Sequence, residues 1–116
     1  MKLPTAFGIS VSDTDDPPVL AVRGEVDLAS APKLAAAMGE LINRGHNQVV
    51  VDLGAVEFID SSGLGVLVGS LKQLRDGGGD LVLCAASAPV SRILELTGLV
   101  ALLPPPSRAA SPPGPG

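Results

Sequence analysis

The stretch FIDSSGLGVL, residues 58–67, lies where one apolar run ends and a predicted helix begins, and so decides the fold. Upstream, QVVVDL (48–53) is a β-branched run typical of a strand buried on both faces. Downstream, leucines and valines recur at helical spacing until the glycines of 77–79. The junction therefore predicts an α/β unit with an acid, two hydroxyls and a glycine where the helix begins.

The rest of the chain alternates between strand and helix signals. Short apolar runs predict strands at 6–11, 19–25, 48–53, 80–85 and 99–103. Apolar periodicity and terminal signals predict helices at 30–45, 61–76 and 87–98. The order β-β-α-β-α-β-α-β predicts one mixed, mostly parallel β-sheet of about five strands, with helices packed against it. The first two strands should form a hairpin, Ser30 can cap the first helix, and Cys84 should be buried and inert.

The 116 residues fit a single domain with a tail. We expect the domain to span residues 1–103. Residues 104–116, PPPSRAASPPGPG, hold six prolines and one charged residue, so we expect a disordered Pro-rich tail.

Composition argues against several classes of function. The net charge is −4, no basic stripe appears, and Phe7 and Phe58 are the only aromatic residues, which disfavours nucleic-acid binding. A single cysteine fits a reducing compartment. The first residues lack the pattern of a signal peptide, and no apolar run reaches the roughly 18 residues of a membrane span. We therefore expect a cytoplasmic protein with no membrane insertion.

Enzyme chemistry finds little support in the sequence. His46 is the only histidine, and the nucleophile pattern G-x-S-x-G is absent around the paired serines. No spacing of ligands suggests a metal, and GLGVLVG has neither a dinucleotide fingerprint nor a P-loop. We expect no catalytic activity, no cofactor and no metal, with a serine hydrolase as the weakest alternative.

The paired serines have two interpretations that the residues alone leave open. Asp60, Ser61 or Ser62 could simply cap the helix. However, a helix start after a parallel strand is also where open α/β sheets place their sites. Gly65 and Gly69 follow on roughly the face of Ser61. They could pack closely against the protein's own sheet, or form a bare strip that another backbone can approach.

The segments FIDSSGLGVLVGSLKQLRDGGGDLVLCAASAPVSRILELTGL and GEVDLASAP (24–32) resemble the STAS domain of bacterial anti-sigma factor antagonists. The resemblance spans about residues 8–103. It implies that Ser61 is a phosphoacceptor for an anti-sigma factor that is itself a serine kinase. The unmodified protein would bind that kinase and free a sigma factor for transcription, for example in a stress response. A phosphatase acting on phosphorylated Ser61 would reset this partner switching.

The resemblance also implies which residues meet the partner. The acid that matches Asp27 contributes to partner binding in relatives, and Asp60 adds charge beside the acceptor. We expect Ser62 to cap the helix, Gly63 to serve the tight turn, and Val66 to be an exposed contact. The candidate surface is Asp27, Asp60, Ser61, Ser62, Gly63, Gly65, Val66 and Gly69. Alternatives are a nucleotide-sensing module and a subunit of a stressosome-like or lipid-transport assembly.

Overall fold

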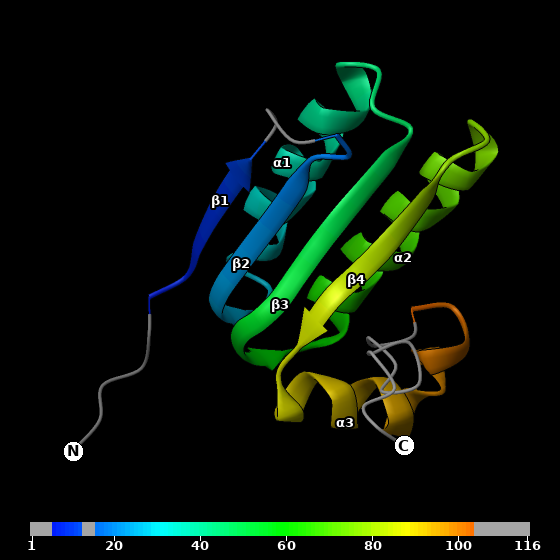
Figure 1. Cartoon of the computed structure of the whole chain (residues 1–116). Helices are drawn as coiled ribbons and strands as arrows, with labels where there is room; N and C mark the ends of the chain where they lie inside the picture. The colour runs from blue at the N-terminus through cyan, green and yellow to red at the C-terminus, as the bar shows by residue number, and fades with distance from the viewer. Residues whose placement is uncertain (1–5, 13–15, 104–116) are drawn as a thin grey trace, which may run out of the picture.

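The computed structural model describes residues 6–12 and 16–103, which form one α/β unit (Figure 1). The predicted Pro-rich tail lies outside the described residues. The elements in chain order are β1 (Gly8–Ser12), β2 (Val19–Val26), α1 (Ala31–Asn43), β3 (Gln48–Ile59), α2 (Ser61–Asp76), β4 (Asp80–Ala86), α3 (Ala88–Thr97) and the short 3-10 helix η1 (Leu99–Ala101).

The sheet is mixed and mostly parallel, as predicted, with the strand order β1-β2-β3-β4. β1 runs antiparallel to β2, so the predicted hairpin is confirmed, whereas β2, β3 and β4 are parallel. The described sheet has four strands instead of about five, because residues 99–103 do not form the predicted strand. Gly98, with φ 76°, ends α3 in the left-handed conformation, and the amides of Leu102 and Leu103 then donate to the carbonyl of Leu99. The segment is therefore a tight turn that buries Leu103 in the core.

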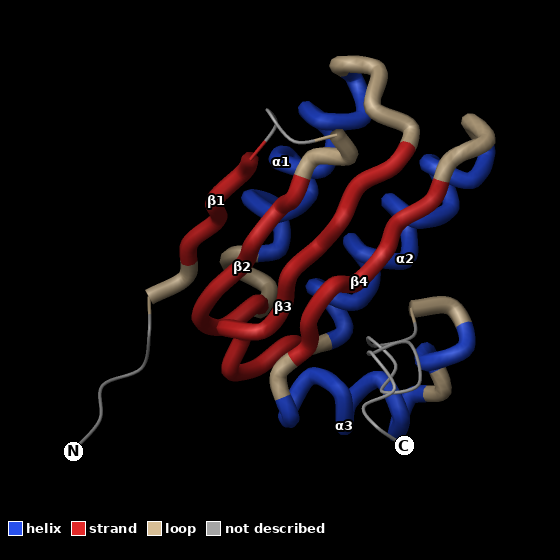
Figure 2. The backbone as a smooth tube through the Cα atoms, in the orientation of Figure 1, coloured by secondary structure: helices blue, strands red, loops and turns tan. Residues whose placement is uncertain are grey.

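Both long helices cover the same face of the sheet, and α3 lies across its lower end in the view of Figure 2. Each crossover, β2–α1–β3 and β3–α2–β4, moves the chain one strand in the same direction. Right-handed crossovers in one direction place their helices on one side. Nearly all core side chains therefore lie between this face and the helices, including Leu20, Leu34, Leu53, Leu67 and Leu94.

The opposite face of the sheet is open, which corrects two predictions. The third strand is not buried on both faces: Val49, Val51 and Leu53 are buried, but Val50 and Asp52 between them are only half-buried. Cys84 is exposed rather than buried, because alternate β4 side chains point away from the helices. Partial desolvation, and to a smaller extent the charge of Asp52, raises the pKa of the Cys84 thiol. The thiol is thus accessible yet protonated at neutral pH.

Candidate functional site

The candidate site lies where the adjacent parallel strands β2 and β3 end. Val26 pairs with Ile59 at the last position of each strand. The amide of Asp60 then donates to the carbonyl of Val26 at 3.1 Å, which ties the start of α2 to the end of β2. The loop that begins at Asp27 and the first turn of α2 therefore leave neighbouring points on one edge. The structure brings together the two segments that the sequence named separately.

Asp60 is the N-cap of α2. Its backbone is extended, and its Oδ1 accepts hydrogen bonds from the amides of Ser62 at 2.8 Å and Gly63 at 3.2 Å. The prediction that Ser62 caps the helix is therefore wrong, because Ser62 is already inside the helical turn, where its hydroxyl cannot reach back to these amides. Ser61 is the first helical residue and its side chain is exposed. The cap role thus falls to the acid, and the Ser61 hydroxyl faces solvent beside it.

Asp27 organises the neighbouring loop. Its Oδ1 accepts hydrogen bonds from the amides of Ala29 at 3.1 Å and Ser30 at 3.0 Å. The Ser30 hydroxyl donates to the same oxygen at 3.1 Å. Together these hydrogen bonds hold the pKa of the Asp27 carboxyl below its ordinary value, and the bond from the Ser30 amide has the largest effect. The carboxylate is therefore charged at neutral pH. It is also fixed in direction by the loop that it closes.

Ser30 holds this loop from the inside and does not cap α1, contrary to prediction. Its side chain makes no bond to the amides of the helix. Instead, the buried hydroxyl accepts from the amide of Asp27 at 2.9 Å and lies 3.0 Å from the carbonyl of Glu25. The hydroxyl thus satisfies backbone groups at the end of β2. The sequence pattern of a cap marked the right residue but the wrong partner.

The glycines of α2 divide into two kinds. A Cβ on Gly63 would lie 2.6 Å from Cγ1 of Val26 and 2.8 Å from Cγ1 of Ile59, so Gly63 lets the first turn pack onto the strand ends. Gly65 and Gly69 are exposed, and a Cβ on either would meet no atom of the described residues within 4 Å. Close packing against the protein's own sheet, one of the two interpretations of these glycines, is therefore excluded for Gly65 and Gly69. They form a bare strip on the outer face of the helix.

Two further residues refine the candidate surface. Val66 is half-buried against the core, so only part of its side chain is available to a partner. Leu28, which the sequence interpretation missed, follows Asp27 and is 77% exposed. Only one sign in the sequence indicated that Leu28 could contact a partner, namely an apolar side chain within a polar turn. The same pattern is equally typical of a residue that packs under the next helix. An open hollow of about 470 Å³ lies beside this loop and is lined partly by Phe7, Glu25 and Lys33.

The described residues also bear on metals and membranes. No group of three or more His, Cys, Asp or Glu side chains within residues 6–12 and 16–103 could hold a metal ion. Among the helices of the same described ranges, none is long and apolar enough to cross a membrane.

Fold and site together define a small α/β domain that presents an exposed serine hydroxyl at a helix N-terminus, next to the carboxylate that caps the helix. A family model described as STAS domain matches residues 9–109. The chain belongs to the STAS domain family, as the resemblance in its sequence predicted.

Similar proteins carry consistent names. The anti-sigma-B factor antagonist of Listeria monocytogenes is 38% identical over 91 residues, which cover 78% of this chain and 79% of the relative. The anti-sigma F factor antagonist of Paenibacillus polymyxa is 37% identical over 89 residues, covering 74% and 76%. The crystal structure of an anti-sigma factor antagonist from Mycobacterium paratuberculosis superposes with a TM-score of 0.77 at 32% identity, covering 94% of this chain and 93% of that one.

Proposed function

We propose that this protein is an anti-sigma factor antagonist that works by partner switching. In its unmodified form it binds an anti-sigma factor that is a serine kinase, and the sigma factor held by that kinase is released. Phosphorylation of Ser61 ends the binding, and a phosphatase restores it. The protein acts as substrate and binder in the cytoplasm, not as a catalyst. The observation that carries the proposal is the exposed Ser61 hydroxyl at the head of α2, beside the Asp60 carboxylate that caps the helix.

The geometry supports a switch that acts on binding more than on folding. A phosphate adds about −1.5 to −2 charges at pH 7. A helix N-terminus favours such an anion by about 0.3–1 kcal/mol, but the amides of Ser62 and Gly63 already donate to Asp60. The phosphate would therefore stand beside a fixed negative charge instead of replacing it. In water this repulsion is screened, so the fold should persist.

At a docked interface the same charges would lose their water. Phosphorylated Ser61, Asp60 and Asp27 would then present like charge along one edge of a desolvated contact, which weakens binding strongly. The unmodified edge offers a different surface: the exposed Leu28 side chain, and Gly65 and Gly69, where a partner backbone can approach α2 closely. We therefore assign partner binding to Asp27, Leu28, Ser61 and the outer face of α2.

The test of the modified residue uses intact-protein mass spectrometry. The protein is incubated with ATP, Mg²⁺ and candidate anti-sigma kinases of the source organism. Wild type and Ser62→Ala should each gain one phosphate, and Ser61→Ala should gain none. Ser62 is a matched control because it is the adjacent hydroxyl on the same helix turn. Undiminished labelling of Ser61→Ala would refute the site.

The test of the switch compares binding before and after modification. Unmodified protein should bind the kinase, and phosphorylated protein should bind at least tenfold more weakly, with an unchanged circular dichroism spectrum and melting temperature. Equal affinity of the two forms would refute the switch even if Ser61 is phosphorylated. Loss of the folded spectrum on phosphorylation would instead refute the reasoning that the fold survives.

A further inference from the structure

Three large apolar side chains stand exposed near the end of the described chain. Leu96 is 74% exposed in the last turn of α3, and Val100 and Leu102 are 36% and 40% exposed in and just after η1. No other stretch of that length in the described residues exposes more than one large apolar side chain. Exposed apolar side chains that gather in one short segment mark a surface that another segment or molecule can cover. We call Leu96, Val100 and Leu102 the terminal patch.

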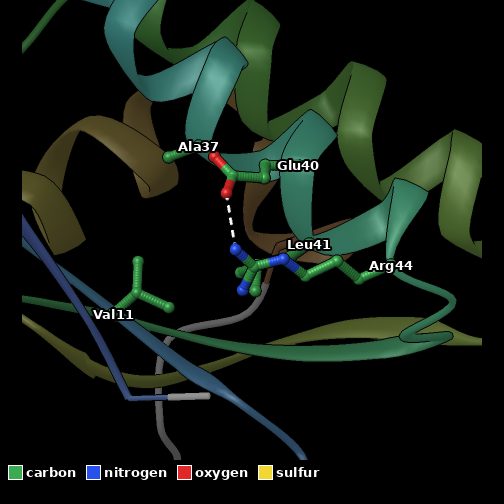
Figure 3. A pocket seen from close by; sticks show the side chains of 5 residues that line it. All are labelled: Val11, Ala37, Glu40, Leu41 and Arg44. Carbon is green, nitrogen blue, oxygen red and sulfur yellow. Dashed lines mark hydrogen bonds and ion pairs between the residues drawn. The ribbon is translucent and has the colours of Figure 1, made fainter.

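A second place with exposed apolar surface, the hollow beside β1, differs because charged side chains line it. Figure 3 shows Val11 across a space of about 260 Å³ from Leu41 of α1. Glu40 and Arg44 line the same space and form an ion pair of 2.7 Å. By contrast, residues 88–103 take part in no ion pair with any other described residue. The terminal patch is therefore apolar surface without a charged rim of this kind.

The chain leaves the described fold beside this patch. Leu103 is buried and its amide donates to the carbonyl of Leu99, so the last described residue is held against the core. The next segment, PPPSRA (104–109), lies outside the described residues. The family model nevertheless matches residues 9–109 and so includes all of this segment. The match thus continues past Leu103, into the part for which the sequence predicts a tail.

We propose that residues 104–109 pack as an extended segment over the terminal patch. The segment begins two positions after Leu102, so it needs no linker to reach the patch. Its three consecutive prolines favour the polyproline II conformation, which rises about 3.1 Å per residue and has little conformational entropy left to lose on docking. The proline rings are apolar, and the segment holds no acid.

The direct covalent connection favours this segment over a second molecule as the cover. A segment joined to its site through a short linker meets it at an effective concentration on the order of millimolar. A second copy of the chain would reach that concentration only in very concentrated solution. The cover is also independent of the switch proposed at Ser61, because it involves only α3, η1 and the residues that follow them.

Thermal unfolding of full-length variants tests the contact. Leu96→Gln keeps a good helix former on α3 but removes the apolar side chain, and it should lower the melting temperature by roughly 4–8 °C. Leu28→Gln is the matched control because Leu28 is similarly exposed, at 77%; it should lower the melting temperature by less than half as much. Equal shifts for the two variants would overturn the proposal.

A double-mutant cycle separates the contact from other effects of each substitution. Replacing the three prolines at 104–106 by serine should also lower the melting temperature. Adding Leu96→Gln to that variant should change the melting temperature little further, because both substitutions remove the same contact. Effects that simply add would mean that the prolines and Leu96 do not touch, and the proposal would be wrong.

Spin labels report on the segment directly. In a Cys84→Ser background, a label attached through Ser107→Cys should give the broad spectrum of an immobilised side chain, and adding Leu96→Gln should restore a sharp spectrum. Ser111→Cys is the matched control, since it lies beyond the residues that the family model matches and should give a sharp spectrum in both backgrounds. A sharp spectrum at position 107 with Leu96 intact, or a broad one that Leu96→Gln leaves unchanged, would refute the docking. A melting temperature that rises with protein concentration would place a second copy on the patch and would refute it as well.

Discussion

Alanine substitutions at the glycines of α2 should have opposite effects on stability. At Gly65 or Gly69 an added Cβ meets open space, and alanine favours a helix over glycine by about 1 kcal/mol. Each substitution should therefore raise the free energy of unfolding by about 1 kcal/mol, or the melting temperature by roughly 4–8 °C for a domain of this size. At Gly63 the Cβ would lie 2.6 Å and 2.8 Å from carbons of the buried Val26 and Ile59. Crowding of this kind costs about 1–3 kcal/mol, which equals or exceeds the helix gain.

Urea unfolding followed by circular dichroism measures the difference, with a constant slope as the sign that only stability has changed. The double variant Gly65→Ala/Gly69→Ala should gain about 2 kcal/mol if the sites are independent. The same variant should bind the proposed kinase partner more weakly, because two methyl groups now cover the bare strip. If Gly63→Ala proved as stabilising as Gly65→Ala, the packing of the first turn of α2 against the strand ends would be wrong.

Four other outcomes follow from the site. Asp60→Ala should lose about 0.5–2 kcal/mol of stability through the missing cap, whereas Ser62→Ala should stay within about 0.5 kcal/mol; equal urea midpoints would contradict the cap. Ser30→Ala should cost about 1 kcal/mol in thermal unfolding, because the partly buried amide of Asp27 and carbonyl of Glu25 lose the hydroxyl that bonds them. The pKa of the Asp27 carboxyl is lower in the folded protein than its ordinary value of 3.8. The ionised carboxylate therefore stabilises the fold fully above that pH, and this stabilisation is lost as the pH falls through the pKa of the folded state. Asp27→Asn should therefore flatten the fall of the urea midpoint with acid. Cys84 should react with a disulfide reagent at pH 7 more slowly than the urea-unfolded chain, and equal rates would contradict its raised pKa.

The sequence predicted the order of elements because periodicity and terminal signals are local properties. It predicted the start of the helix at Ser61 for the same reason, but β3 runs to Ile59, six residues beyond the predicted end of that strand at Leu53. The prediction of a strand at 99–103 was wrong because five consecutive aliphatic residues show no periodicity that would distinguish a strand from a turn. Exposure of Cys84 could not be predicted, because an apolar run does not tell whether helices cover one face of a sheet or both.

In the candidate site, too, the sequence predicted the local features but not those that depend on tertiary packing. A cap somewhere among Asp60, Ser61 and Ser62 was predictable, but the choice depended on which residue keeps an extended backbone, here Asp60 with φ −107°. The roles of the glycines depended on how α2 is rotated over the sheet. That rotation places Gly63 against Val26 and turns Gly65 outward, and it is fixed by the whole core and not by the segment itself.

The open face of the sheet has a practical consequence. Cys84 is the only cysteine of the chain and it is exposed there, on the side away from α1 and α2. A fluorophore or surface tether attached through this thiol would leave the outer face of α2 accessible to a binding partner. Wild-type protein can thus be immobilised in a single orientation, with coupling run at mildly alkaline pH to overcome the raised pKa. Affinities of the modified and unmodified forms could then be compared on one sensor surface, without any engineered attachment site.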